Sequence, residues 1–214
     1  MAKSLNDRFS LYRNADILLA TISTSSLFNK AVQQVEYNVA SSIFSNYLKD
    51  PDDVMVVLSE VFDSYNVNSR HIYSFAFLLL LYNGFKEQEI LDLVSSDIDF
   101  DNRTVKGVSI YPQFWDVIIN ANKSNVVYIR RNTEVVSSDK IIKYLVVDFV
   151  KVLREELYKI KRDVPTIPSG LSLSNIRISG RWYNSYLLEL AGNTPTVTIS
   201  EKSDYENYKK VYFK

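Results

Sequence analysis

Apolar residues recur at three- and four-residue spacing along most of the chain, which is the pattern of amphipathic α-helices. In residues 26–48, for example, the repeating apolar positions are Val32, Val35, Val39, Ile43 and Tyr47. The same spacing predicts helices over 4–22, 51–64, 69–83, 86–94 and 111–122, a longest helix over 137–161, and a further helix that begins near residue 172 and ends at Gly192.

Local sequence signals set two of the helix ends. Asp50-Pro51-Asp52-Asp53 is a start signal, because an aspartate caps the first turn, proline has a helical φ, and acids favour the positive end of the helix dipole. Asn83-Gly84 is a stop signal, because glycine adopts the positive φ of a helix C-cap at little cost. We therefore expect one helix to begin at residue 51 and another to end at residue 83.

Two short stretches have strand character instead. Ile98 and Phe100 alternate with polar residues, Asp101-Asn102 forms a turn, and residues 104–106 resume an extended run, which predicts a β-hairpin. Residues 125–130 predict another short strand, and the tail 194–214 is expected to start extended and end in a short helix. The predicted fold class is mainly α with a small β-hairpin or sheet.

The composition narrows the class of protein. A chain of 214 residues with 46% hydrophobic residues can form one large domain, here divided into an N-terminal helical segment (1–50) and a main domain (51–214). The absence of cysteine excludes disulfides and thiolate chemistry. The longest apolar run, residues 75–82, is far shorter than the roughly 20 residues that span a bilayer. We expect a soluble cytoplasmic protein that does not enter membranes.

Formal net charge is zero, but its distribution along the chain is uneven. Residues 1–100 contain 7 Lys/Arg and 13 Asp/Glu, whereas residues 101–214 contain 18 and 12. This asymmetry indicates either a basic face that contacts nucleic acid or two halves that attract each other. The candidates for a basic face are Arg130, Arg131 and the basic residues Lys140, Lys143, Lys151 and Arg154 of the predicted long helix.

Several kinds of site are excluded by residue type. His71 is the only histidine, so the chain cannot form a multi-histidine metal site. Asp97, Asp99 and Asp101 have the alternate spacing of a calcium loop but lack its downstream glycine and glutamate. No phosphate-binding glycine loop is present. We therefore expect no metal and no cofactor.

The order of an apolar helix, Asn-Gly, a short acidic helix and Asp-Ile-Asp resembles the catalytic domain of tyrosine recombinases, the phage integrase family. Gly84, Phe85, Glu89, Ile90, Leu93 and Asp97-Ile98-Asp99 fall on its first box, and LSLSNIRIS resembles the second box, where a helix opens with His-x-x-Arg. The resemblance covers roughly residues 50 to 214 and implies an integrase-like catalytic-domain fold over 51–214. The segment before it is too short for the DNA-clamping domain that recombinases usually carry.

In this family a tyrosine attacks a DNA phosphodiester while two arginines and a lysine stabilise the developing charge. The resemblance places Lys86 at the first arginine, Ser174 at the histidine and Arg177 at the second arginine. Lysine lacks the planar fork that grips two phosphate oxygens, and serine is no general acid or base near neutral pH. After Gly192, where the family often has histidine, this chain has Asn193.

The remaining family positions are less sharply defined. The catalytic lysine of the family lies in the hairpin after Asp-Ile-Asp, where this chain has Lys106. Alignment through Gly192 places the nucleophile at Tyr205, whereas the interval from Arg177 favours Tyr208. Both assignments remain open.

Loss of several transition-state stabilisers, each worth on the order of 10²–10³ in rate, predicts a catalytically inactive protein. The resemblance then implies a DNA-binding or regulatory protein of a phage or mobile element, similar to integrase-fold phage repressors. The expected DNA contacts are Lys86, Arg130, Arg131, Lys140, Lys143, Arg177 and Arg181.

Two alternatives remain open for the function: a divergent active recombinase that uses a C-terminal tyrosine, and a protein-interaction module that has lost DNA binding. The protein could also act together with a phage regulatory protein. The aromatic C-terminal tail is expected either to dock on a neighbouring subunit in a homo-oligomer or to pack within its own chain.

Overall fold

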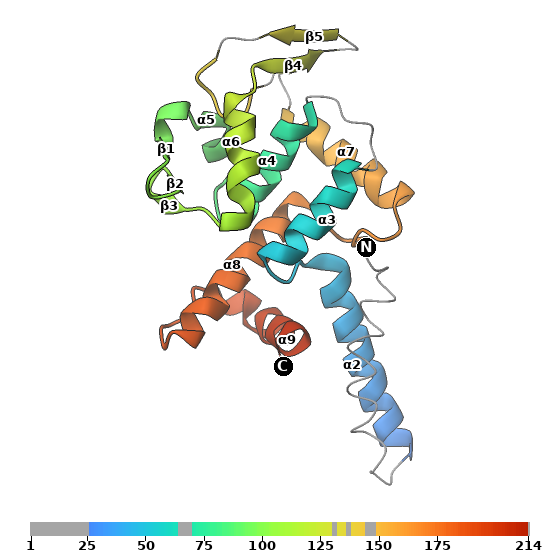
Figure 1. Cartoon of the computed structure of the whole chain (residues 1–214). Coiled ribbons are helices and arrows are strands. Elements are labelled where there is room, and N and C mark those ends of the chain that lie inside the picture. Colours follow the sequence, from blue (N-terminus) through green and yellow to red (C-terminus); the bar gives the residue numbers. More distant parts are fainter. Residues whose placement is uncertain (1–25, 64–69, 130–131, 136–137, 144–148, 214) are drawn as a thin grey trace.

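The computed structural model describes residues 26–63, 70–129, 132–135, 138–143 and 149–213 (Figure 1). This part of the chain is mainly helical, with a three-stranded antiparallel sheet and a separate two-stranded hairpin. The predicted fold class is confirmed at this level, and the recombinase-like fold stays a prediction. Within these ranges, no helix combines the length and the hydropathy needed to cross a membrane. The helix predicted over residues 4–22 lies outside the described residues.

The predicted helices are found in their expected order. They are α2 (Ser26–Asn46), α3 (Pro51–Asp63), α4 (Arg70–Tyr82), α5 (Glu87–Asp92), α6 (Pro112–Lys123), α7 (Phe149–Asp163), α8 (Leu173–Leu190) and α9 (Lys202–Tyr212), with short 3₁₀ turns η1 (Ser95–Asp97) and η2 (Ile199–Glu201). The start signal of α3 is confirmed, because the Asp50 carboxylate accepts the Asp53 backbone N–H at 2.9 Å.

Helix α4 forms the centre of the main core. Its last seven residues, 76–82, are at most 1% exposed, because α3, α6 and α8 pack around it. Figure 1 shows α4 beside α6 and above α8, with α5 and the small sheet on the other side of α6. A helix that is apolar on all sides can be stable in water only in such a buried position.

The predicted stop at Asn83-Gly84 is confirmed. Gly84 has φ +108°, and the N–H groups of Gly84 and Phe85 donate to the carbonyls of Leu81 (3.1 Å) and Leu80 (3.2 Å). These two bonds form a Schellman cap, which satisfies carbonyls at the end of α4. Phe85 is buried after this turn, so the chain enters α5 in a fixed direction.

The predicted hairpin is confirmed, and a third strand extends it. Strand β1 (Ile98–Asp99) pairs with β2 (Thr104–Val105), which pairs with β3 (Val108–Ser109), all antiparallel. The strand predicted over 125–130 is β4 (Val126–Ile129), and it pairs with β5 (Asn132–Val135), which the sequence pattern did not predict.

The helix predicted over 137–161 is wrong in its first part. Residues 138–143 are not helical; instead Ser95 donates to the Asp139 carbonyl (2.7 Å) and Ile141 donates to the Leu93 carbonyl (3.1 Å). Residues 141–143 are all buried, and three consecutive buried positions do not fit the one-sided pattern of a surface helix. Helix α7 begins at Phe149, and α2, not α7, is the longest described helix.

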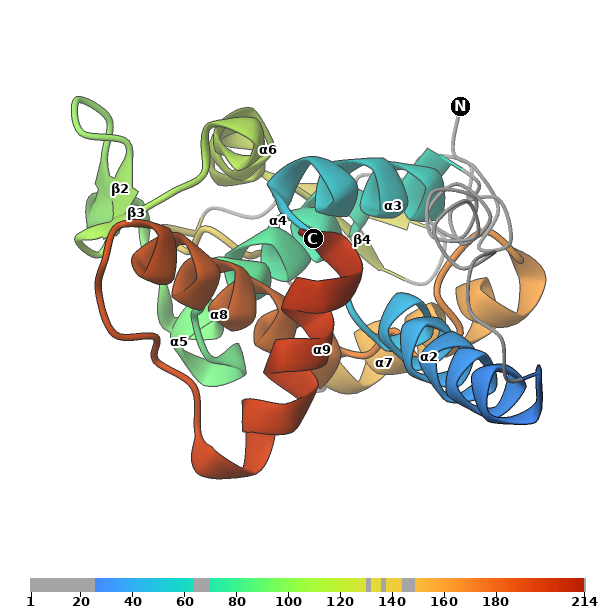
Figure 2. The ribbon, with the colours of Figure 1, turned by 90° about the horizontal axis from the view of Figure 1, so that it is seen from below.

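A second, aromatic core joins the two ends of the described chain. Ile43 and Phe44 of α2 pack with the ring of Trp182 from α8 and with three tyrosines of α9, namely Tyr205, Tyr208 and Tyr212. Figure 2 shows α9 packed beside α8, with α2 on its other side. The C-terminal tail therefore packs within its own chain here, and docking on another subunit stays a prediction.

Candidate functional site

Two distant segments meet where α8 crosses the end of α4. A Cβ added to Gly180 would stand 1.6 Å from the Tyr82 carbonyl oxygen, so only glycine allows this close approach. Arg177 lies one turn before Gly180 on a similar side of α8, because residues three apart are neighbours on a helix surface. The crossing therefore brings Arg177 to the end of α4, from which the chain turns toward Lys86.

The Glu89 carboxylate lies at the centre of the resulting site. One oxygen accepts the Lys86 backbone N–H at 2.8 Å, and the other is 3.7 Å from the Lys86 Nζ. The hydrogen bond from the Lys86 backbone lowers the pKa of Glu89, and the positive charges of Lys86, Arg177 and Lys106 lower it further, although desolvation opposes them. Glu89 thus lies within electrostatic reach of cations from three separate elements.

Lys106 is presented by a tight turn of the small sheet. Lys106 (φ +49°) and Gly107 (φ +76°) form the two-residue connection between β2 and β3, where Val105 pairs with Val108. Two consecutive positive φ angles are typical of a type I′ turn, which favours asparagine and glycine. Lysine at its first position costs roughly 1–2 kcal/mol of backbone strain, and such strain is often found at functional positions.

These cations are accessible to a ligand. The Lys86 side chain is 66% exposed, Lys106 is exposed and Arg177 is half-buried. Within the described ranges, neither Lys106 nor Arg177 forms an ion pair with an acidic side chain. Three positive charges thus lie within electrostatic range of one carboxylate, which leaves a net positive charge that would attract a phosphate group.

The other positions implied by the recombinase resemblance carry no ionisable group suited to proton transfer. Ser174 is exposed in the first turn of α8, and Asn193 is exposed just after the C-terminal turn of that helix at Gly192 (φ +76°). A hydroxyl and an amide cannot accept or release a proton near neutral pH. The two residues therefore lie at opposite ends of α8, and neither side chain can act as a general acid or base.

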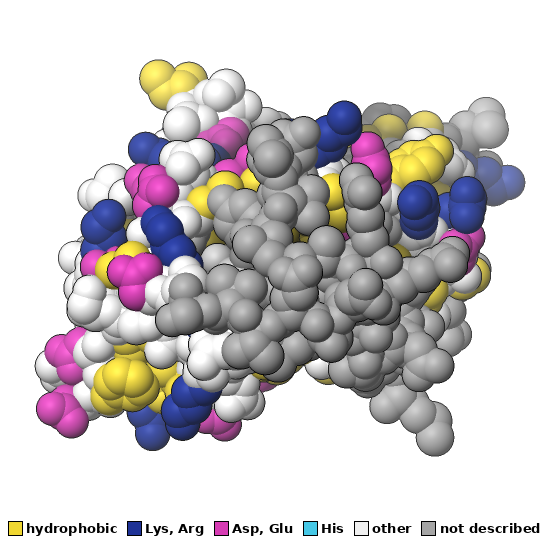
Figure 3. All heavy atoms as spheres, turned by 90° about the horizontal axis from the view of Figure 1, so that it is seen from above, with side chains coloured by type: hydrophobic (Ala, Val, Ile, Leu, Met, Phe, Trp, Pro, Cys, Tyr) yellow, Lys and Arg dark blue, Asp and Glu magenta, His cyan; other side chains and the backbone are white. Residues whose placement is uncertain are grey.

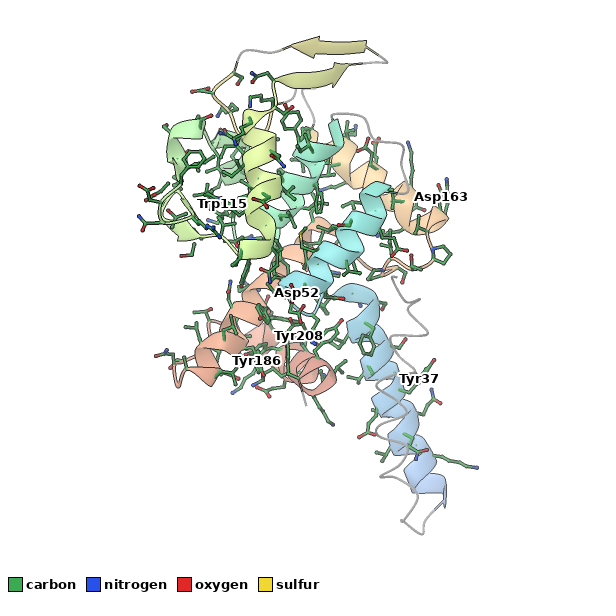
Figure 4. The ribbon with its side chains drawn as sticks, in the orientation of Figure 1. Tyr37, Asp52, Trp115, Asp163, Tyr186 and Tyr208 are labelled. Atoms are coloured by element: carbon green, nitrogen blue, oxygen red, sulfur yellow. The ribbon has the colours of Figure 1, made fainter. Side chains whose placement is uncertain are left out.

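Both candidate nucleophiles are buried in the aromatic core. The Tyr208 hydroxyl donates to the backbone carbonyls of Leu48 (3.2 Å) and Lys49, and burial raises its pKa well above the ordinary value. Tyr205 is 1% exposed, and burial beside Glu189 raises its pKa as well. Figure 4 shows Tyr208 among α8, α9 and α2, away from α5 and the small sheet.

The remaining residues that were predicted to contact DNA lie in different environments. Arg181 is paired with Glu201 of the C-terminal segment, and Lys140 lies 3.6 Å from Asp92. Lys143 is only 3% exposed, its Nζ donates to the Asn122 carbonyl at 2.6 Å, and desolvation lowers its pKa. This burial does not fit the predicted surface contact, because the segment pairs with residues 93–95 instead of forming a helix. Arg130 and Arg131 lie outside the described residues.

The sequence did not indicate the partner of Glu87, the first residue of α5. The carboxylate of Glu87 binds the Arg154 guanidinium of α7 at 2.8 Å, an interaction between residues far apart in the chain. Figure 3 shows Lys/Arg and Asp/Glu side chains lying beside one another on the described part of one face. In the ranges that the structure describes, no group of His, Asp or Glu side chains is arranged to hold a metal ion.

Comparison with known proteins adds no relative to this picture. No family model matches the chain, and neither the curated proteins nor the solved structures compared with it give a match. The resemblance to tyrosine recombinases therefore remains a prediction that rests on the sequence motifs.

Proposed function

We propose that the protein is a catalytically inactive, tyrosine-recombinase-like DNA-binding protein of a phage or mobile element, acting as a repressor or accessory factor. The observation that carries this proposal is that the positive charges of Lys86, Lys106 and Arg177, from three separate elements, all act on the Glu89 carboxylate and lower its pKa. The three cations come from the start of α5, the β2–β3 turn and α8. Their convergence depends on the fold and does not follow from their spacing in the sequence.

The chemistry of the three cations favours phosphate as the ligand. Arg177 offers a planar guanidinium that binds two phosphate oxygens together, and the two lysines add point charges. Phosphate contacts of this kind supply affinity and position a protein on DNA, but they read no base sequence. This agrees with a protein that holds DNA and leaves sequence recognition to other contacts.

The same geometry gives little support to strand cleavage. A tyrosine nucleophile must reach the phosphate and lose its proton, but Tyr205 and Tyr208 are buried and burial raises the pKa of both. Ser174 and Asn193 supply no proton donor or acceptor of useful pKa. Binding without cleavage is the function that these side chains support best.

The test is duplex DNA binding as a function of salt concentration. We expect Lys86→Gln and Arg177→Gln each to weaken binding to all duplex sequences and to reduce the salt slope by about 1, because each removes one phosphate contact. Arg162→Gln is the control, since it removes one exposed positive charge near the C-terminal end of α7. Equal binding by the Lys86→Gln/Arg177→Gln double variant and the control would contradict the proposal.

The two alternative functions, an active recombinase and a protein-interaction module, predict different experimental results. A covalent adduct with nicked duplex DNA that disappears in Tyr205→Phe or Tyr208→Phe would establish the active recombinase instead. Absence of DNA binding at low salt would favour the protein-interaction module. We expect binding without an adduct.

A further inference from the structure

Three carboxylates of one short helix each lie beside a cation; two of the cations come from other segments, and the third, Lys86, immediately precedes the helix. Glu87 binds Arg154 of α7 at 2.8 Å, Glu89 lies 3.7 Å from the Nζ of Lys86, and Asp92 lies 3.6 Å from that of Lys140. Helix α5 consists of only six residues, Glu87–Asp92, so these acids are concentrated directly next to Lys86.

We propose that α5 limits the affinity of the protein for DNA by acting as a built-in competitor of the DNA phosphates. In this arrangement the carboxylates of Glu87 and Asp92 occupy Arg154 and Lys140, two cations that would otherwise extend the phosphate-binding surface. This inference rests on the proposed function, and it concerns how tightly the same site binds.

Glu87 and Asp92 make different contacts from Glu89. Glu89 fixes the backbone at the start of α5 through the N–H of Lys86. Glu87 bonds through both of its oxygens to one nitrogen of Arg154, and Asp92 accepts a bond from Gln88 of the same helix at 3.1 Å. Neither Glu87 nor Asp92 caps α5, so each can be neutralised while the Glu89 cap is kept.

These ion pairs are weak enough for phosphate to compete with them. The Arg154 and Glu87 side chains are 59% and 37% exposed, and exposed pairs contribute only about 0–1 kcal/mol. A phosphate that approaches Lys86 meets the negative charge of Glu87 on the adjacent residue. Removal of that charge both ends the repulsion and releases Arg154 toward the DNA.

The chain contains a closely matched control pair. Arg162 and Asp163, also on α7, form an ion pair at 2.8 Å with side chains that are 67% and 43% exposed. Figure 4 shows Asp163 on the side of the molecule opposite to α5 and the small sheet. Asp163→Asn therefore changes the net charge as Glu87→Gln does, but at a distance from the proposed site.

The experiment measures binding of a mixed-sequence DNA duplex to the full chain at several salt concentrations. We expect Glu87→Gln to tighten binding about twofold to fivefold and to steepen the salt slope by about 1, since one more phosphate is neutralised. Asp92→Asn is expected to act similarly through Lys140. In Glu87→Gln/Arg154→Gln the gain in slope should disappear, because the released cation is gone.

The outcomes separate this inference from the proposed function. If Lys86→Gln and Arg177→Gln weaken binding but Glu87→Gln binds no tighter than Asp163→Asn, the competitor role is overturned and the DNA site stands. If Lys86→Gln and Arg177→Gln have no effect, the proposed site is overturned. Absence of binding by every variant, Glu87→Gln included, overturns both.

Discussion

Gly180 of α8 lies so close to the Tyr82 carbonyl of α4 that an added Cβ would stand 1.6 Å from its oxygen. This contact permits the close approach of α8 to the central helix. Arg177 lies one turn before Gly180 on α8, so the same crossing brings its charge within electrostatic range of Glu89.

Gly180→Ala is expected to lower the free energy of unfolding by about 1–3 kcal/mol, although alanine has the higher helix propensity, because the two backbones must separate. Urea denaturation measures this change. Ser174→Ala, an exposed substitution on the same helix, should stay within about 0.5 kcal/mol of the wild type. A Gly180→Ala protein as stable as Ser174→Ala would show that the two helices can separate at no cost.

The substitution Lys106→Asn removes the positive charge of this residue and leaves a side chain that suits the positive φ of the turn. Asparagine suits a positive φ better than lysine does, so the variant should be as stable as the wild type or more stable by up to about 1 kcal/mol. It should also bind duplex DNA more weakly, with a salt slope reduced by about 1. Thermal unfolding and salt-dependent binding measure the two effects, and unchanged binding would remove Lys106 from the site.

Tyr208→Phe should lower the free energy of unfolding by about 1 kcal/mol or more, because the carbonyls of Leu48 and Lys49 lose their donor. Tyr82→Phe is the matched comparison. The Tyr82 hydroxyl is buried and has no hydrogen-bond partner in the described structure, so its removal should leave stability unchanged or raise it slightly. Equal effects of the two substitutions in urea denaturation would contradict the anchoring role of Tyr208.

Stability should fall steeply as the pH rises above about 10. Burial raises the pKa of Tyr82 and Tyr208 well above the ordinary value of 10.0, so above pH 10 these groups lose protons more readily in the unfolded chain. The stabilisation is complete below pH 10 and is lost as the pH rises toward the folded-state values. Lys143 alone has the opposite effect: because its pKa is lowered, its contribution to stability increases as the pH rises.

Ultraviolet absorbance of tyrosinate, followed together with circular dichroism, checks this pH dependence. The buried tyrosines are expected to ionise only in the same transition in which helix signal is lost. Complete ionisation of all tyrosines while the helices persist would show that the buried tyrosines are accessible to hydroxide.

Local sequence signals predicted the elements whose ends depend on a few neighbouring residues. The Asp50 cap, the Gly84 turn and the first hairpin are confirmed, because capping bonds and positive φ angles are decided within one or two turns of chain. The segment 138–143 was mispredicted because its backbone bonds go to residues 93–95, which no local pattern reveals.

For the candidate site, the motif order pointed to Lys86, Lys106 and Arg177 as residues, but not to their surroundings. Which cations stay available and which are paired or buried depends on groups distant in the chain. The Glu201 carboxylate pairs with Arg181, the Glu87 carboxylate pairs with Arg154, and the Asn122 backbone carbonyl accepts a hydrogen bond from the Lys143 Nζ. Local patterns in the sequence predicted most of the described helices, the ends that have a capping signal, and the residue types of the site. The charge balance of the site and the burial of Tyr205 and Tyr208 could not be predicted in this way, because both result from packing between elements distant in the chain.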